Sequence, residues 1–166
     1  MAQVLALLLP VVLLLQDPAS RPATQPAARS ADVATPEALV AALYDVISGP
    51  AGQKRDADRF RSLFLPGARM VVVQSRPDGS VAVVPLAVDE HVRRSFPVLE
   101  QRGFWERGAE TRFAKTAHTA QAWSRYEIRF GSADAEVSVR GVNAFHLVSD
   151  GARWWIAALQ WEADPR

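Results

Sequence analysis

The fold is decided by residues 104–161, FWERGAETRFAKTAHTAQAWSRYEIRFGSADAEVSVRGVNAFHLVSDGARWWIAALQW. Alternating and β-branched residues fill four successive segments, at about Phe104–Lys115, Thr116–Phe130, Glu136–Val148 and Arg153–Trp161. The separator Ser149-Asp150-Gly151 has the chemistry of a tight hairpin turn. These residues predict four antiparallel strands in a meander.

Helical patterns precede this meander. Thr35-Pro36 places a hydroxyl at an N-cap and proline at the first helical position. Pro97 is expected to kink or shorten the last helix. The predicted elements are a helix from Thr35-Pro36 to Gly49-Pro50, a short helix from Asp56 to Pro66-Gly67, a hairpin of Met70–Val73 and Val81–Val84, and a helix over Ala87–Gln101. Helices segregated from a meander indicate an α+β fold, with three helices packed on a strongly curved antiparallel sheet and a cavity between them.

Composition limits the class of protein. The chain has 166 residues, of which 49% are hydrophobic, which suits one folded domain. Its formal net charge of +1 argues against nucleic-acid binding, which normally needs a basic excess. The absence of cysteine excludes disulfides, thiolate metal sites and a cysteine nucleophile.

The amino-terminal region has a different character. The apolar run Val4–Leu15 has the length of a signal-peptide core and is short for a membrane span. We expect residues 1–20 to be a signal peptide or a membrane anchor, 21–34 a linker rich in proline and alanine, and 35–163 the folded domain. We therefore expect a secreted or periplasmic protein that contacts the membrane only through its amino-terminal segment.

Strand alternation singles out candidate catalytic residues. His118 and Tyr126 share the more apolar face of their predicted strand. Histidine carries protons near neutral pH, and a tyrosine hydroxyl can stabilise a developing enolate oxygen. Glu106, on the preceding strand, could orient His118, act as a base itself, or pair with Arg125 or Arg140. Both His118 and Tyr126 could equally be core residues.

Further polar and aromatic side chains are candidates for ligand binding. Asn143 lies on the same face of its predicted strand as Phe145 and Leu147, which is expected to face inward. Arg140 could hold an anionic ligand or pair with a carboxylate. Tyr44 lies on the apolar face of the first helix, and Trp155 and Trp161 are expected to share one face of the last strand. The glycine of Arg140-Gly141-Val142-Asn143 indicates a bulge or a close backbone approach.

No cofactor or metal site is predicted. His91, His118 and His146 fall on different elements, without the spacing of metal ligands. The chain contains no glycine-rich nucleotide motif and no G-x-S-x-G nucleophile motif.

Six local strings are distinctive: Leu63-Phe64-Leu65-Pro66-Gly67-Ala68-Arg69, Gly103-Phe104-Trp105-Glu106, Ala117-His118, Ser124-Arg125-Tyr126-Glu127, Arg140-Gly141-Val142-Asn143 and Asp150-Gly151-Ala152-Arg153-Trp154-Trp155-Ile156. With the order of elements over about Pro36 to Trp161, they resemble the nuclear-transport-factor-2-like (NTF2-like, SnoaL-like) superfamily of cystatin-like cones. The resemblance implies a cone-shaped pocket between sheet and helices, acid–base chemistry in the enzymatic relatives, and sheet-to-sheet dimers.

Three functions remain open at this point. The first is a non-catalytic module that binds a small apolar or carbonyl-containing ligand, or serves in assembly, as a homodimer through the sheet face. The second is a cofactor-independent lyase or isomerase, with dehydratase or ketosteroid-isomerase-like proton transfer by His118 and Tyr126. The third is a subunit or immunity-type partner that uses a tryptophan-bearing sheet face.

Overall fold

The structure is a computed structural model that describes residues 25–76 and 78–164. The predicted signal peptide or anchor at residues 1–20 lies outside these residues. Within the described part of the chain, no helix is both long and apolar enough to span a bilayer.

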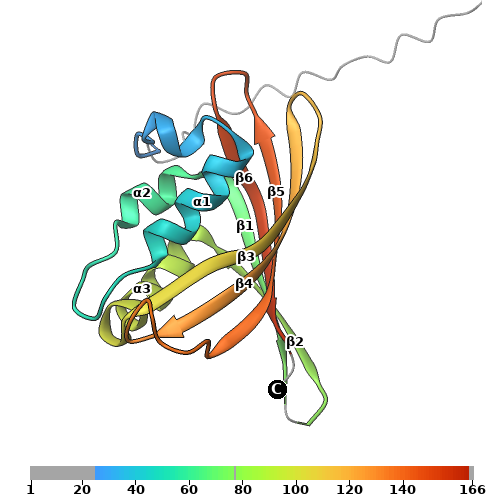
Figure 1. The fold of residues 1–166 in the computed structure, drawn as a ribbon. Coiled ribbons are helices and arrows are strands. Elements are labelled where there is room, and N and C mark those ends of the chain that lie inside the picture. The colour runs from blue at the N-terminus through green and yellow to red at the C-terminus, as the bar shows by residue number, and fades with distance from the viewer. Residues whose placement is uncertain (1–24, 77, 165–166) are drawn as a thin grey trace, which may run out of the picture.

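The predicted order of helices and strands is confirmed (Figure 1). Gly49-Pro50 and Asp150-Gly151 lie between elements, whereas Pro66-Gly67, predicted to end the short helix, lies inside the first strand, so that helix is shorter than predicted. In chain order, the elements are the 3-10 helix η1 (Ser30–Val33), α1 (Pro36–Ile47), α2 (Ala57–Ser62), β1 (Phe64–Ser75), β2 (Val81–Ala87), α3 (Val88–Arg102), β3 (Phe104–Lys115), β4 (Thr119–Phe130), β5 (Val139–Ser149) and β6 (Trp154–Ala163).

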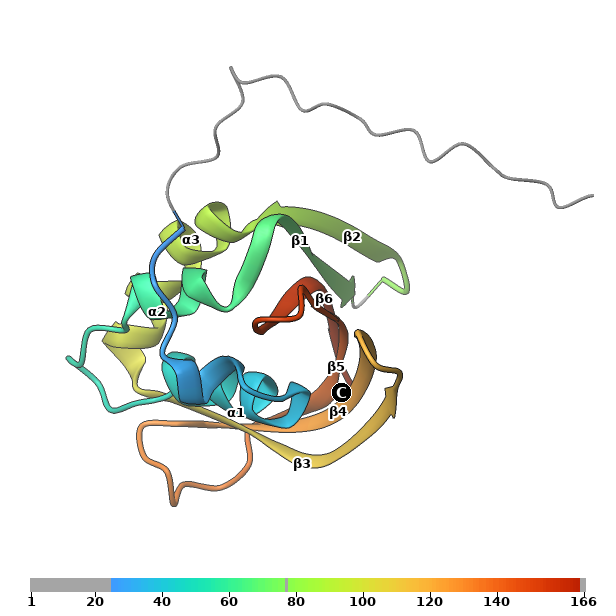
Figure 2. The same ribbon diagram turned by 90° about the horizontal axis from the view of Figure 1, so that it is seen from above.

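The six strands form one sheet in the order β2-β1-β6-β5-β4-β3. Figure 2 shows that the sheet curves strongly, with its two arms on either side of the helices. The expected α+β class, with helices packed on a strongly curved sheet, is therefore confirmed. The sheet is mixed rather than wholly antiparallel, because β1 pairs in parallel with β6. This pairing joins the β1–β2 hairpin to the last strand, so that all six strands belong to one open sheet.

Local chemistry explains where the helices begin and end. The Thr35 hydroxyl accepts a hydrogen bond from Ala38 N at 3.1 Å, and Asp56 caps α2 in the same way. Pro97 lies inside α3 without ending it, so the predicted shortening is wrong. The helix instead ends at Gly103, whose φ of 66° suits glycine.

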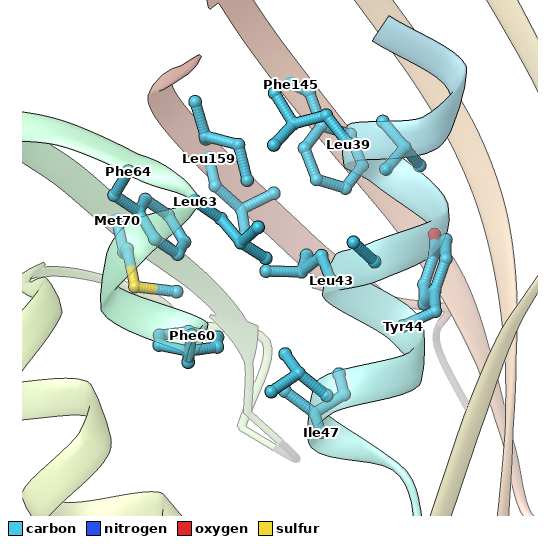
Figure 3. Packing of buried hydrophobic residues seen from close by; sticks show 14 of the residues in the cluster. Leu39, Leu43, Tyr44, Ile47, Phe60, Leu63, Phe64, Met70, Phe145 and Leu159 are labelled. Carbon is cyan, nitrogen blue, oxygen red and sulfur yellow. The ribbon is translucent and has the colours of Figure 1, made fainter. Parts of the chain in front are cut away.

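The core lies between the helices and the concave face of the sheet. Figure 3 shows side chains of α1, including Leu43 and Ile47, lying across from Phe60 of α2 and Met70 of β1. Phe60 and Leu63 are 1% and 0% exposed. Each such fully buried side chain contributes about 1.5–3 kcal/mol through the hydrophobic effect.

The segment expected to be a solvated linker is partly packed on the domain. Val33 is buried, and the Asp32 carboxylate accepts two hydrogen bonds from the Arg59 guanidinium, at 2.7 and 3.0 Å. Hydrogen bonding to Arg59 lowers the pKa of Asp32. Gln25 donates to the backbone carbonyl of Phe64 at 2.9 Å. Residues 25–34 therefore belong to the folded unit as a strap along α1 and α2.

Candidate functional site

A cavity of about 240 Å³ lies between the helices and the concave face of the sheet, partly open to solvent. Its walls are mainly apolar, and every helix α1–α3 contributes to them. Six of its side chains are polar or bear a polar tip: His91, Ser95, Glu106, Tyr126, Asn143 and Trp161. An apolar cavity of about 150 Å³ can hold benzene. This larger one has room for a ring with a short polar substituent.

The main polar group is the Glu106 carboxyl, which β3 directs inward. Asn143 of β5 donates from Nδ2 to Glu106 Oε1 at 2.8 Å. No protein atom among the described residues donates a hydrogen bond to Glu106 Oε2. One carboxyl oxygen is therefore held by the protein, and the other can meet a ligand.

A chain of hydrogen bonds continues behind Asn143. Its Nδ2 also donates to the Tyr44 hydroxyl at 3.1 Å, and that hydroxyl donates to Ser124 Oγ at 2.7 Å. Ser124 in turn shares a 2.7 Å hydrogen bond with Thr111 Oγ1. Tyr44, labelled in Figure 3, leaves α1 for this network and does not line the cavity wall. Burial raises its pKa to about 12, so the hydroxyl stays neutral. The network fixes the position of Asn143.

The end of α1 holds the backbone of Glu106. Ser48 Oγ donates to Glu106 O at 3.1 Å and accepts from Glu106 N at 3.0 Å. Gly49 and Phe104 exchange two backbone hydrogen bonds, of 2.7 and 3.0 Å. These contacts attach the start of the edge strand β3 to the helix layer and set the direction of the Glu106 side chain.

The surroundings of Glu106 change its acidity. Burial raises the pKa of its carboxyl to about 7, and the hydrogen bond from Asn143 opposes that shift. Glu106 is half-buried and lines the cavity. No lysine or arginine lines the cavity in the described part of the chain. The predicted ion pair with Arg125 or Arg140 does not form, because those residues pair with Asp164 and Glu127 on the outer face.

Tyr126 lines the same cavity, and Gly141 makes room for it. The two residues are cross-strand partners, and a Cβ built on Gly141 would lie 2.4 Å from the Tyr126 hydroxyl and 2.2 Å from Glu162 O. The sequence predicted either a bulge or a close backbone approach at Gly141, and the close approach is correct. Burial, followed by the nearby Glu106 carboxylate, raises the pKa of Tyr126 above its ordinary range. Its hydroxyl stays protonated and can donate.

His91 was not singled out as a pocket residue by the sequence, yet α3 places it in the wall. Its ring stacks on Phe60 and meets Trp161 edge-on, both at 5.6 Å between centroids, and Nδ1 is 3.4 Å from Ser95 Oγ. Burial lowers the pKa of His91 to about 4, so the ring is neutral at pH 7. Helical spacing places residues 91, 95 and 99 on one face, which is the signal that could have identified it.

His118 lies outside the cavity, contrary to the expectation from strand alternation. Strand β4 begins only at Thr119, and His118 is an exposed residue of the turn after β3. Alternation is valid only within a strand, where it correctly places Ala120, Ala122 and Tyr126 on the buried face. The structure thus brings Glu106, Tyr126 and Asn143 together and leaves His118 apart.

Three other candidates divide between the two sheet faces. Arg140 is exposed on the outer face, with Nε 3.5 Å from Glu127 Oε1. Trp155 also faces outward, and its Nε1 donates to Asp150 Oδ2 at 2.8 Å. Trp161 lines the cavity. The two tryptophans lie on opposite faces because the β5–β6 register shifts between Ile156 and Ala158, which reverses the alternation.

The residues present give no metal centre. Within residues 25–76 and 78–164, no three histidine, aspartate or glutamate side chains gather closely enough to bind an ion. The polar groups in the cavity wall are one carboxyl, one phenol, one amide, one neutral imidazole, one hydroxyl and one indole N–H.

Comparison with solved structures identifies the fold. A Nostoc punctiforme protein of unknown function with a cystatin-like fold is 15% identical and has a TM-score of 0.57, over 76% of this chain and 86% of that one. An NTF2-like protein from Cytophaga hutchinsonii is 9% identical with a TM-score of 0.51, over 76% and 89%. A candidate dehydratase of the NTF2-like family from Streptomyces avermitilis is 14% identical with a TM-score of 0.52, over 80% and 100%.

These likenesses define the class of the molecule: it has the NTF2-like, cystatin-like fold. The resemblance noted in the sequence is thereby confirmed at the level of the fold. No protein-family model matches the chain, and no curated protein does.

Proposed function

We propose that the chain binds a small, mainly apolar molecule in the cavity, with the ligand's polar group against Glu106. The observation that supports this most directly is the presence of one half-buried carboxyl among mainly apolar walls. Apolar concave sites with a few placed polar groups are typical of ligand binding. A carboxyl kept away from water without a cationic partner costs stability, and a ligand-binding role explains its presence.

Filling the cavity should abolish binding. In Ser95→Phe, a ring replaces a small side chain of the cavity wall, and we expect the affinity for toluene and for benzyl alcohol to fall at least about tenfold. The matched control is Val98→Phe on the same helix, at a position that is 49% exposed and does not line the cavity. Ligand-observed NMR measures both. Equal binding by the two variants, or none of either probe by the parent, would contradict a ligand site here.

A second candidate function is proton transfer at carbon next to a carbonyl. It is favoured by one observation, the presence in one cavity of a carboxyl with a pKa of about 7 and a neutral tyrosine hydroxyl. Glu106, rather than His118, would remove the α-proton of a ketone. Tyr126 would hydrogen-bond the enolate oxygen, and the Glu106 carboxylic acid would return a proton to carbon.

This reaction can be followed as deuterium uptake. With cyclohexanone in deuterated water, we expect the full chain to accelerate exchange of the α-hydrogens, and Glu106→Gln to slow it by about 100-fold or more. Glu110→Gln on the exposed face of the same strand is the control. Exchange at the uncatalysed rate with the parent protein would exclude this function and leave binding alone.

The outer sheet face supports assembly as a homodimer. Trp123 is 57% exposed there, and Val83 is 65% exposed. Two hollows flank Trp123, and Ala144 contributes to both. A second copy of the chain could place its own Trp123 into such a hollow, as a two-fold interface requires.

Replacing this tryptophan by a charged residue tests the assembly. We expect the parent chain to sediment as a dimer and Trp123→Glu as a monomer, because a carboxylate would be desolvated in the contact. Gln121→Glu, also exposed on β4, controls for added charge. A parent that remains monomeric at high concentration would refute the dimer.

A further inference from the structure

The electrostatics of the cavity are unbalanced. Glu106 is the single acidic side chain in its wall among the described residues, and no lysine or arginine accompanies it. An anionic ligand would therefore meet a carboxylate without a compensating cation. The cavity wall therefore supplies no positive charge to balance the Glu106 carboxylate.

The hydrogen-bond network is oriented toward a carboxylate. Asn143 Nδ2 donates hydrogen bonds to Glu106 Oε1 and to the Tyr44 hydroxyl. The Tyr44 hydroxyl in turn donates a hydrogen bond to Ser124 Oγ. Donation to a carboxyl oxygen favours its ionised form. The protein thus supplies a donor for one oxygen of the ionised group and leaves the other without one.

The remaining walls suit a positively charged group. Phe60, Phe104, Tyr126 and Trp161 contribute aromatic rings to the cavity. Aromatic faces attract cations, and the attraction strengthens where water is excluded. His91 adds no competing positive charge, because it is neutral at pH 7.

We propose that the cavity selects a small organic amine, bound as its ammonium form, with N–H directed at Glu106 Oε2 and its hydrocarbon body against the aromatic walls. This inference rests on the proposed ligand-binding function and names the chemical class of ligand. The cavity volume of about 240 Å³ sets the size, at about one ring with a one-carbon arm.

Three probes that share one ring separate the alternatives: benzylamine, benzyl alcohol and benzoate. We measure their affinities for the full chain by NMR titration at about pH 6 and about pH 8. At the higher pH we expect benzylamine to bind at least about tenfold tighter than benzyl alcohol, and benzoate to bind weakest. Benzylamine affinity should rise between the two pH values as Glu106 ionises. The other titratable groups facing it, Tyr44 of α1, Tyr126 of β4 and His91 of α3, keep their neutral form over this range.

Variants complete the test. Glu106→Gln should lose about tenfold or more in benzylamine affinity and all of its pH dependence, while benzyl alcohol affinity changes little. Glu110→Gln should behave as the parent. Benzyl alcohol binding as tightly as benzylamine, with both lost in Ser95→Phe, would overturn the amine preference and leave the ligand site intact. No binding of any probe, toluene included, would overturn the site itself.

Discussion

Arg55→Leu is expected to lower the free energy of unfolding by about 4 kcal/mol, because Arg55 joins the end of α1 to the loop that follows it. The residue is 6% exposed. Its guanidinium donates to five backbone carbonyls, and the three shortest of these bonds reach Ile47 at 2.9 Å, Gly49 at 2.6 Å and Gln53 at 2.6 Å. The last carbonyls of a helix have no partner within the helix. Leucine would leave the buried Ile47 carbonyl without this donor and would remove one of the two donors to Gly49 O.

Chemical denaturation followed by circular dichroism measures the effect. Lys54→Leu, an exposed neighbour, should change the free energy of unfolding by less than about 0.5 kcal/mol. Arg55→Lys should recover part of the loss, since a single ammonium cannot serve three carbonyls in the geometry of a guanidinium. An Arg55→Leu protein as stable as the parent would show that water replaces the guanidinium.

The effect should reach the cavity as well. Gly49 and Ser48 follow α1 directly, and they hold Phe104 and the backbone of Glu106. A loosened end of α1 therefore moves the candidate site without changing any residue in its wall. Arg55 lies between the two helices predicted from the sequence and received no role there. A buried arginine whose partners are backbone carbonyls leaves no pattern of side-chain types.

Periodic patterns explain what could be predicted from the sequence. The apolar spacing of α1 and the alternation within β4 follow from helix and strand geometry, so they identified Tyr44 and Tyr126 as residues of the buried side. Alternation placed Asn143 inward for the same reason, and the structure adds its two partners.

The errors have equally definite causes. His118 lies beyond the end of β4, so alternation did not apply to it. Trp155 and Trp161 are separated by a register shift in β6, which the residue types do not reveal. The raised pKa of Glu106 depends on walls from several elements distant in sequence, so no local motif could indicate it.

Glu106→Gln is expected to stabilise the protein by about 3 kcal/mol above about pH 7. Folding raises the pKa of this carboxyl from 4.5 to about 7, and each pKa unit corresponds to about 1.4 kcal/mol. The folded state therefore binds the proton more tightly than the unfolded state does. The stability that this provides is fully present below pH 4.5 and is lost as pH rises through about 7.

Urea denaturation of both proteins between about pH 4.5 and pH 8 provides the measurement, read as the difference in free energy at each pH. His91 acts in the opposite sense, since its pKa falls from 6.5 to about 4 on folding and its contribution to stability grows as pH rises over that range. The contribution of His91 cancels when the free energies of the two proteins are subtracted, because both proteins retain His91. Glu110→Gln should leave the pH profile of the parent unchanged.

A stabilising Glu106→Gln would link energetics to function. Glutamine retains the shape and can still accept from Asn143 Nδ2, so the variant removes only the titrating charge. If the protein becomes more stable at high pH while benzylamine affinity falls, the carboxylate lowers stability and serves ligand binding. A difference in free energy that stays constant with pH would mean that water solvates the Glu106 carboxylate in the folded state. The Glu106 carboxylate would then need no positively charged ligand beside it.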